Sequence, residues 1–219
     1  NLVDLPNNRK LHQGSVPLVG GISIYLSIII SILYIDIDYS LLIIILSSGI
    51  ILILGVLDDS IELGIIIRLI SQLIASLIII GTGLSIIDIG DYYYFTPIQL
   101  GIFGILLTVF SVIGLTNAIN FIDGIDGLCS GLVLIALLTL YFYIYFSGTS
   151  NELVIIKLFI TSILAFLLIN LGLTPFKKAF LGDAGSMVLG FILSWALIYY
   201  SHPTNRFIHP VLTIWCVAL

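Results

Sequence analysis

Long apolar runs separated by short polar connections are the feature that most constrains how this chain can fold. The runs are Val16–Ile35, Leu41–Leu57, Ile65–Gly81, Ile98–Thr116, Leu128–Phe146, Leu153–Leu173, Ser186–Tyr200 and Pro210–Leu219. The sequence is 60% hydrophobic and 9% charged, which leaves too few polar residues to cover a soluble domain. In lipid, about 20 apolar residues form a helix because a helix satisfies its own backbone hydrogen bonds. The pattern predicts an all-α, polytopic integral membrane helical bundle of about eight transmembrane segments, the last incomplete.

The bundle is expected to be a single transmembrane domain over residues 1–219. The first 14 residues are polar without a signal-peptide pattern, and the chain stops inside an apolar run. We therefore expect a fragment of a longer membrane protein, truncated at both ends. The net charge of -5 does not suit nucleic acid, whose binding needs a basic surface.

The polar connections alternate between two faces of the membrane. Face one comprises residues 1–15, 58–64, 117–127 and 174–185, and face two comprises residues 36–39, 84–96, 147–152 and 201–209. Most of the basic residues lie on or near face one: Arg9, Lys10, Arg68, Lys177 and Lys178. The positive-inside rule therefore predicts that face one is cytoplasmic. The acids of face two, such as Asp88, are interpreted as solvated loop residues.

Acids and amides that could carry chemistry all fall on face one. They are the pair Asp58 and Asp59, the string Asn117, Asn120, Asp123 and Asp126, and Asp183 between two glycines. Such groups are costly beside a membrane unless they bind something, and oxygen-rich ligand sets suit Mg²⁺ or Mn²⁺ rather than zinc. The structural alternatives are a solvated pair at a helix end, an Asp-Gly turn and, for the third element, a helix N-cap.

Basic residues on the same face provide partners for phosphate groups. Lys178 lies just before the third acidic element, where it could meet a diphosphate. Near the start of the chain, Arg9, Lys10 and His12 precede a Pro-Leu-Val-Gly-Gly entry into the membrane, and they could hold a lipid phosphate or only anchor the topology. With apolar walls for a lipid tail, this inventory suits phosphoryl transfer from a soluble donor to a membrane acceptor.

These motifs resemble those of the polyprenyl-phosphate N-acetylhexosamine-1-phosphate transferases, glycosyltransferase family 4. The matching motifs are Asp4-x-Pro-x-x-Arg-Lys-x-His12, Pro17-Leu-Val-Gly-Gly21, Asp58-Asp59, Asn117-Ala-Ile-Asn-Phe-Ile-Asp-Gly-Ile-Asp-Gly-Leu128 and Leu181-Gly-Asp-Ala-Gly-Ser-Met187. The likeness is closer to the WecA-like branch, which makes undecaprenyl-diphosphate-GlcNAc, than to the MraY-like branch, which transfers phospho-MurNAc-pentapeptide.

The resemblance implies a multi-pass enzyme of the inner (plasma) membrane with a cytoplasmic active site and Mg²⁺ or Mn²⁺ as cofactor. It implies transfer of N-acetylhexosamine-1-phosphate, GlcNAc-1-phosphate by the closer likeness, from a UDP-sugar to undecaprenyl or another polyprenyl phosphate. UMP is released, and a lipid-linked cell-envelope glycan is begun. A homodimer is one expected assembly, although the sequence leaves the oligomeric state open.

The expected site residues follow from the motif match and from the basic residues described above. The expected catalytic residues are Asp58, Asp59, Asp123 and Asp126. The expected metal ligands are Asp183 and Asp123. The expected substrate-binding residues are Asn117, Asn120, Arg9, Lys10, His12 and Lys178.

Two departures from the family pattern stand out. Glu62 replaces the last acid of the family's Asp-Asp-x-x-Asp. The family's C-terminal His-rich cytoplasmic motif does not occur within these residues, so we expect the isolated fragment to be inactive. The competing hypotheses are an MraY-like transferase or a relative that uses another UDP-N-acetyl sugar, a divalent-cation transporter, and a non-catalytic lipid-binding scaffold. A transporter predicts acids in the middle of spans 98–116 and 153–173, where none occurs.

Overall fold

The computed structural model describes residues 2–4, 14–90, 97–147 and 153–211. Its helices are α1 (Gly20–Ile32), α2 (Tyr39–Ile61), α3 (Ile65–Ile80), α4 (Ile102–Ile122), α5 (Leu128–Phe146), α6 (Val154–Asn170) and α7 (Gly182–Ser201). Two short strands, β1 (Val3–Asp4) and β2 (Val16–Pro17), pair in antiparallel fashion. Helices α2, α4, α5 and α7 are long and apolar enough to cross a membrane. The predicted all-α, polytopic membrane bundle is therefore confirmed.

The number of spans differs from the expected eight. Seven helices lie in the described ranges, and α1, α3 and α6 are apolar but shorter, with 13, 16 and 17 residues. Residues 212–219 of the predicted eighth span lie outside the described residues. The first predicted span also starts later than expected, because Val16 and Pro17 form an edge strand, a position that tolerates proline. The single domain over residues 1–219 stays a prediction.

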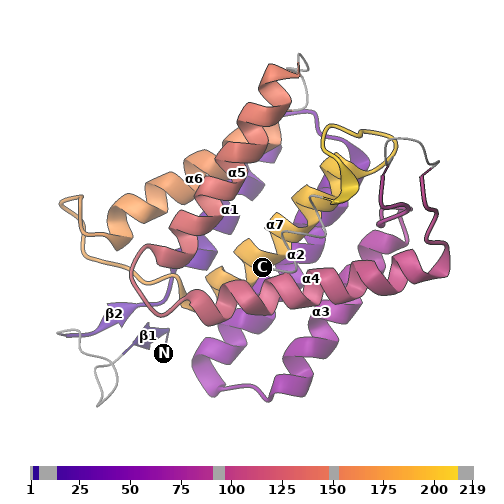
Figure 1. Cartoon of the computed structure of the whole chain (residues 1–219). Helices are drawn as coiled ribbons and strands as arrows, with labels where there is room; N and C mark the ends of the chain where they lie inside the picture. Colours follow the sequence, from indigo (N-terminus) through magenta and orange to yellow (C-terminus); the bar gives the residue numbers. More distant parts are fainter. Residues whose placement is uncertain (1, 5–13, 91–96, 148–152, 212–219) are drawn as a thin grey trace.

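Helix α7 lies at the centre of the bundle (Figure 1). It packs most extensively against α2 and α4, and also against α1 and α5. Nearly every residue from Ala184 to Ser201 is buried. Since protein rather than lipid surrounds this helix, it can carry small residues such as Ser186, Gly190 and Ser194, which let neighbouring backbones approach closely. The position of α7 therefore depends on contacts with its neighbours.

Glycines of α1 and α2 make room for the start of α7. A Cβ atom on Gly21 would collide with the backbone of Gly185, and a Cβ atom on Gly55 would collide with the backbone of Ala184. The first turn of α1 is also tied to the segment before α7, because the Gly21 N–H donates to the Leu181 carbonyl at 3.2 Å. The Pro-Leu-Val-Gly-Gly motif thus has a structural role, which is to seat the beginning of α7.

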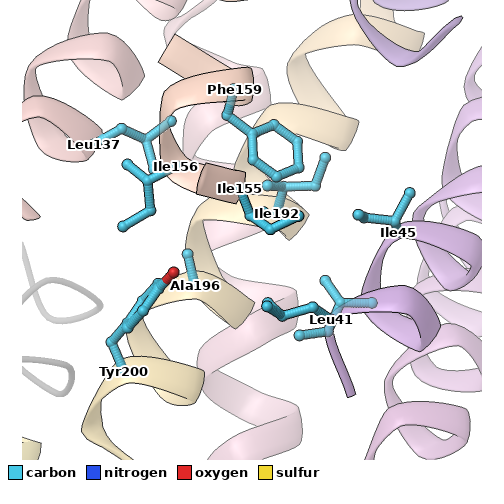
Figure 2. Close-up of a pocket in the computed structure, with 10 residues that line it drawn as sticks. Leu41, Ile45, Leu137, Ile155, Ile156, Phe159, Ile192, Ala196 and Tyr200 are labelled. Carbon is cyan, nitrogen blue, oxygen red and sulfur yellow. The ribbon is translucent and has the colours of Figure 1, made fainter. Parts of the chain in front are cut away.

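A small apolar cavity lies beside the other half of α7. Figure 2 shows side chains of α2, α5, α6 and α7 around it, and the lining residues are Leu41, Ile44, Ile45, Leu137, Ile155, Ile156, Phe159, Ile192, Ala196 and Tyr200. Among these residues, only Tyr200 carries a polar side-chain group. The α7 residues of the cavity lie more than two turns beyond Asp183. The cavity is therefore separate from the polar residues at the start of α7.

Two polar segments of face two meet at the opposite end of the bundle. Arg206 Nη2 donates to Asp88 Oδ2 at 2.7 Å, which joins the connection before α4 to the segment after α7. Asp88 is buried, so its interpretation as a solvated loop residue is wrong. The paired guanidinium compensates the carboxylate for its lost hydration. This grouping agrees with the predicted alternation of the connections between two faces.

Replacing Gly55 by alanine should weaken the bundle, because the added methyl group would overlap the backbone of Ala184. Overpacking of this kind costs about 1–3 kcal/mol. The matched control is Gly131→Ala in α5, where an added Cβ meets nothing within 4 Å and alanine favours the helix by up to about 1 kcal/mol. Thermal unfolding of the detergent-purified full-length protein should show a lower Tm for Gly55→Ala only. Equal Tm values for the two variants would contradict the proposed close contact.

Candidate active site

The ends of α2 and α4 lie beside the start of α7 (Figure 1), and Asp59, Asn120 and Asp183 come together there. Both α2 and α4 are longer than their apolar runs, so Asp58, Asp59, Asn117 and Asn120 lie on helices rather than in the predicted connections. The helices can continue through these residues because the side chains bond to groups on neighbouring helices instead of water. The helix ends thus place these polar groups inside the bundle.

Asp59 caps the start of α7 from α2. Its Oδ1 accepts a hydrogen bond from the Asp183 N–H at 2.8 Å, and its Oδ2 accepts one from the Ala184 N–H at 3.2 Å. The first N–H groups of a helix have no partner within the helix, and a negative charge there is also stabilised by the helix dipole. Gly182 has φ +75°, and a Cβ atom on it would lie 2.7 Å from Asp59 Oδ2. This position needs glycine for both reasons.

Asp183 lies in the first turn of α7 and does not cap the helix. The N-cap alternative is therefore wrong, because Asp59 occupies the N–H groups that such a cap would use. The Asp183 Oδ1 accepts a hydrogen bond from Asn120 Nδ2 at 2.9 Å, and the same amide lies 2.8 Å from Ser186 Oγ. The Asp183 side chain is 46% exposed. Its carboxylate is thus oriented by the protein yet open to a ligand.

Asp58 is buried and holds Arg68. Its Oδ1 accepts a hydrogen bond from the Leu63 N–H at 2.6 Å, and its Oδ2 lies 3.0 Å from Arg68 Nη1. The same Nη1 lies 3.9 Å from Asp183 Oδ2. From the sequence, Arg68 is predicted only to help set the membrane topology. The available signal was a lone arginine inside an apolar run, near the carboxylate pair in sequence. The structure places this cation between two of the acids.

Asp123 and Asp126 follow the end of α4 and differ in their surroundings. Burial, together with the negative charges of Asp183, Asp59 and Asp126, raises the pKa of Asp123 to about 7. Asp126 forms an ion pair with Lys178 on the rim of the site, and the ammonium group also lies 6.0 Å from the centre of the Phe180 ring. Within the described residues, Asp123 has no ion-pair partner.

Some predicted site residues lie elsewhere. Asn117 points to α3 rather than to Asp183, because its Nδ2 donates to Gln72 Oε1 at 2.7 Å and to the Ile113 carbonyl at 2.7 Å. Glu62, which is not among the predicted site residues and only departs from the family motif, is exposed and follows the end of α2 in a left-handed conformation with φ 52°. The predicted substrate-binding residues outside the described part of the chain are Arg9, Lys10 and His12.

The carboxylates of Asp183 and Asp123 fit a divalent cation. Asp183 and Asp123 supply oxygen atoms, and the negative charges that raise the pKa of Asp123 are of the kind that a cation offsets. Magnesium is usually held by one or two carboxylates, with waters and substrate phosphates completing its coordination. Within the described residues, no three acids, histidines or cysteines form a ready-made metal cage. The donor set therefore suits a cation shared with a substrate.

The fold and the site together define a polytopic helical membrane protein with a polar, acid-rich site at one end of its bundle. The chain belongs to glycosyl transferase family 4, since the model of that family matches residues 41–201. The family resemblance of the sequence motifs is therefore confirmed.

Curated relatives match along almost the whole chain. It is 34% identical over 222 residues to the undecaprenyl-phosphate alpha-N-acetylglucosaminyl 1-phosphate transferase of Escherichia coli (strain K12), with 100% of this chain and 60% of the relative covered. The protein of that name from Salmonella typhi is 35% identical over 226 residues, with the same coverage. A probable undecaprenyl-phosphate N-acetylglucosaminyl 1-phosphate transferase of Bacillus subtilis (strain 168) is 34% identical over 217 residues, covering 97% of this chain and 60% of the relative. The chain thus spans 60% of the length of these relatives.

The charge on Asp123 should make the protein less stable as the pH rises. Its pKa of about 7 in the folded state exceeds the value of about 3.9 in an unfolded chain, so the folded state binds more protons between these values. Stability is therefore lost progressively from about pH 4 to about pH 7. Asp123→Asn cannot ionise, and its Tm relative to wild type should increase over that range.

The measurement is thermal unfolding of the full-length protein in chelator at about pH 5 and about pH 8, which bracket most of the titration. Asp36→Asn is the control, because Asp36 is an exposed acid at the other end of the bundle. A Tm difference between Asp123→Asn and wild type that stays constant across this range would contradict the electrostatic account.

Proposed function

We propose that the protein containing this chain transfers N-acetylhexosamine-1-phosphate, with GlcNAc-1-phosphate as the first choice, from a UDP-sugar to a polyprenyl phosphate. The observation that carries the proposal is the placement of Arg68 between Asp58 and Asp183 at the start of α7. This arrangement puts a cation for phosphate next to an open carboxylate for a metal. The names of the relatives, which specify undecaprenyl phosphate and N-acetylglucosaminyl 1-phosphate transfer, support the same reaction.

This reaction depends mainly on the positioning of the lipid phosphate and the UDP-sugar. An oxygen of the lipid phosphate forms a new bond to the phosphorus that carries the sugar. The bond from that phosphorus to the oxygen it shares with the α-phosphate breaks, and UMP leaves. The second pKa of a phosphate monoester is about 6, so the attacking phosphate is largely dianionic at neutral pH. Holding the reactants in line and offsetting their negative charge therefore matter more than a dedicated general base.

The residues of the site have separate roles in binding the metal, binding the phosphates and fixing the helix. Asp183 and Asp123 would hold Mg²⁺ or Mn²⁺, which supplies positive charge to the donor diphosphate when bound. Arg68 faces the same space and would contact a phosphate oxygen. Lys178 lies on the rim in its pair with Asp126, within reach of an incoming diphosphate. Asp59 acts on the protein itself, by fixing the start of α7.

Apolar side chains beside the site suit the prenyl chain of the acceptor. Ile61, Ile65 and Ile66 at the turn between α2 and α3 are 66–72% exposed. Ile65 and Ile66 come three and two residues before Arg68 in α3, and further exposed apolar residues, such as Leu69 and Leu73, follow along the same helix. A lipid in the bilayer could therefore bring its phosphate to Arg68 while its tail stays against apolar groups.

The orientation and assembly form part of the proposal. The concentration of Lys and Arg on face one supports a cytoplasmic site in a multi-pass protein of the plasma membrane. A UDP-sugar is a cytoplasmic substrate, which agrees with that orientation. The product would begin a lipid-linked glycan of the cell envelope. A homodimer stays a prediction.

The test uses membranes that contain the full-length protein, radiolabelled UDP-GlcNAc, polyprenyl phosphate and Mg²⁺, and it measures labelled lipid diphosphate. Asp183→Asn should lower product formation at least about 100-fold, because it removes a charge that acts on the reacting phosphates. Asp36→Asn at the other end of the bundle should leave the rate unchanged.

Parallel assays contain UDP-GalNAc or UDP-MurNAc-pentapeptide in place of UDP-GlcNAc. Labelled lipid from UDP-MurNAc-pentapeptide alone would overturn the sugar assignment in favour of the MraY-like reaction. The transferase proposal fails if wild-type protein gives no lipid-linked product with any of these donors.

A further inference from the structure

Two layers of side chains stack at the site end of the bundle, one helical turn apart. The site layer consists of Arg68 on α3, Asn120 on α4 and Asp183 on α7. The support layer lies on the same three helices and consists of Gln72, Asn117 and Met187. Each support residue is three or four positions from its site residue, which places it on the same helix face one turn deeper in the bundle.

Gln72 connects the three members of the support layer. Its Oε1 accepts the hydrogen bond from Asn117 Nδ2 at 2.7 Å, and its Nε2 lies 3.8 Å from Met187 Sδ, a weak acceptor. Gln72 is completely buried. A buried hydrogen bond between two side-chain amides is directional, and no water competes with it. Gln72 therefore links α3 to both helices that carry the other residues of the site layer.

Helix α3 packs against α2 and α4, and it does so mostly through small buried residues. Its buried residues are Ser71, Gln72, Ala75, Ser76 and Ile79, most of which are small. Its larger apolar side chains, including Leu69, Leu73 and Leu77, are exposed on the bundle surface. Small residues let neighbouring helices approach closely. They do little, however, to fix the rotation of a helix about its axis or its depth in the bundle. The hydrogen bond between Gln72 and Asn117 thus adds a directional contact that sets how α3 is rotated, and it acts together with the Arg68–Asp58 ion pair to place Arg68.

We propose that Gln72 and Asn117 are positioning residues, which hold the site layer in register and act on the reaction through Arg68 and Asn120. The Asn117 amide belongs to the interior of the bundle and does not contact the substrate. This inference rests on the proposed function of the site. It also predicts a structural effect that can be measured without any catalytic activity.

The catalytic test compares variants of the full-length protein in membranes. Gln72→Leu keeps a similar volume and removes both bonds, so kcat should fall about tenfold or more through misplacement of the site layer. The double variant Gln72→Asn with Asn117→Gln exchanges the long and short amides, and it should recover kcat to within about threefold of wild type. Ser76→Ala is the matched control, because Ser76 is buried one turn deeper and bonds within its own helix.

The structural test is hydrogen–deuterium exchange of residues 117–123 in the purified protein. Gln72→Leu should speed hydrogen exchange at this end of α4. The double variant Gln72→Asn with Asn117→Gln and the control Ser76→Ala should both match wild type. This readout holds even if wild-type protein makes no lipid product, an outcome that counts against the proposed function alone.

Three results would overturn the inference. The first is unchanged exchange in Gln72→Leu. The second is a Gln72→Leu protein with a lower Tm but a normal kcat, which would make the contact only structural. The third is a kcat of the double variant Gln72→Asn with Asn117→Gln that is as low as that of Gln72→Leu, which would indicate that Asn117 itself contacts the substrate.

Discussion

The hydrogen bonds between Asp59 and the start of α7 are the interaction on which the rest of the site depends. Helix α7 is enclosed by protein, so its first N–H groups cannot rely on water and need a partner inside the bundle. Asp59 provides that partner from α2. The contact requires close packing, which Gly55 permits at the crossing of the two helices and Gly182 permits at the carboxylate itself. The capping of α7 by Asp59 therefore depends on the close packing of α2 against α7.

Because of this packing, the neighbouring acids Asp58 and Asp59 have different roles. Adjacent residues on a helix point about 100° apart, so Asp59 can reach α7 while Asp58 turns to Arg68. Asp183 keeps an open carboxylate because its backbone, rather than its side chain, is used for capping. The Asp-Asp pair thus shapes the site from two directions, and the third carboxylate is the one best placed to meet a ligand.

The sequence could predict the class of fold and much of the site, but not the helix ends within it. The run 128–146 coincides with α5, and Gly127 in a left-handed conformation with φ 76° marks the start of that helix. By contrast, α2 and α4 continue past their apolar runs, since Asp59 and Asn120 find partners on α7, which only the tertiary structure reveals. The motif string identified the acids, but it could not identify Arg68 or Gln72. Each is a single polar residue in an apolar run, and its role depends on contacts between helices.

Anomalous X-ray scattering can locate Mn²⁺ bound with a UDP-sugar to the full-length protein, and this position distinguishes the roles of the acids. We expect a metal at bonding distance from the Asp183 carboxylate, with Asp59 still accepting the first N–H groups of α7. A metal chelated by Asp58 and Asp59 together, with the start of α7 released from Asp59, would contradict this expectation.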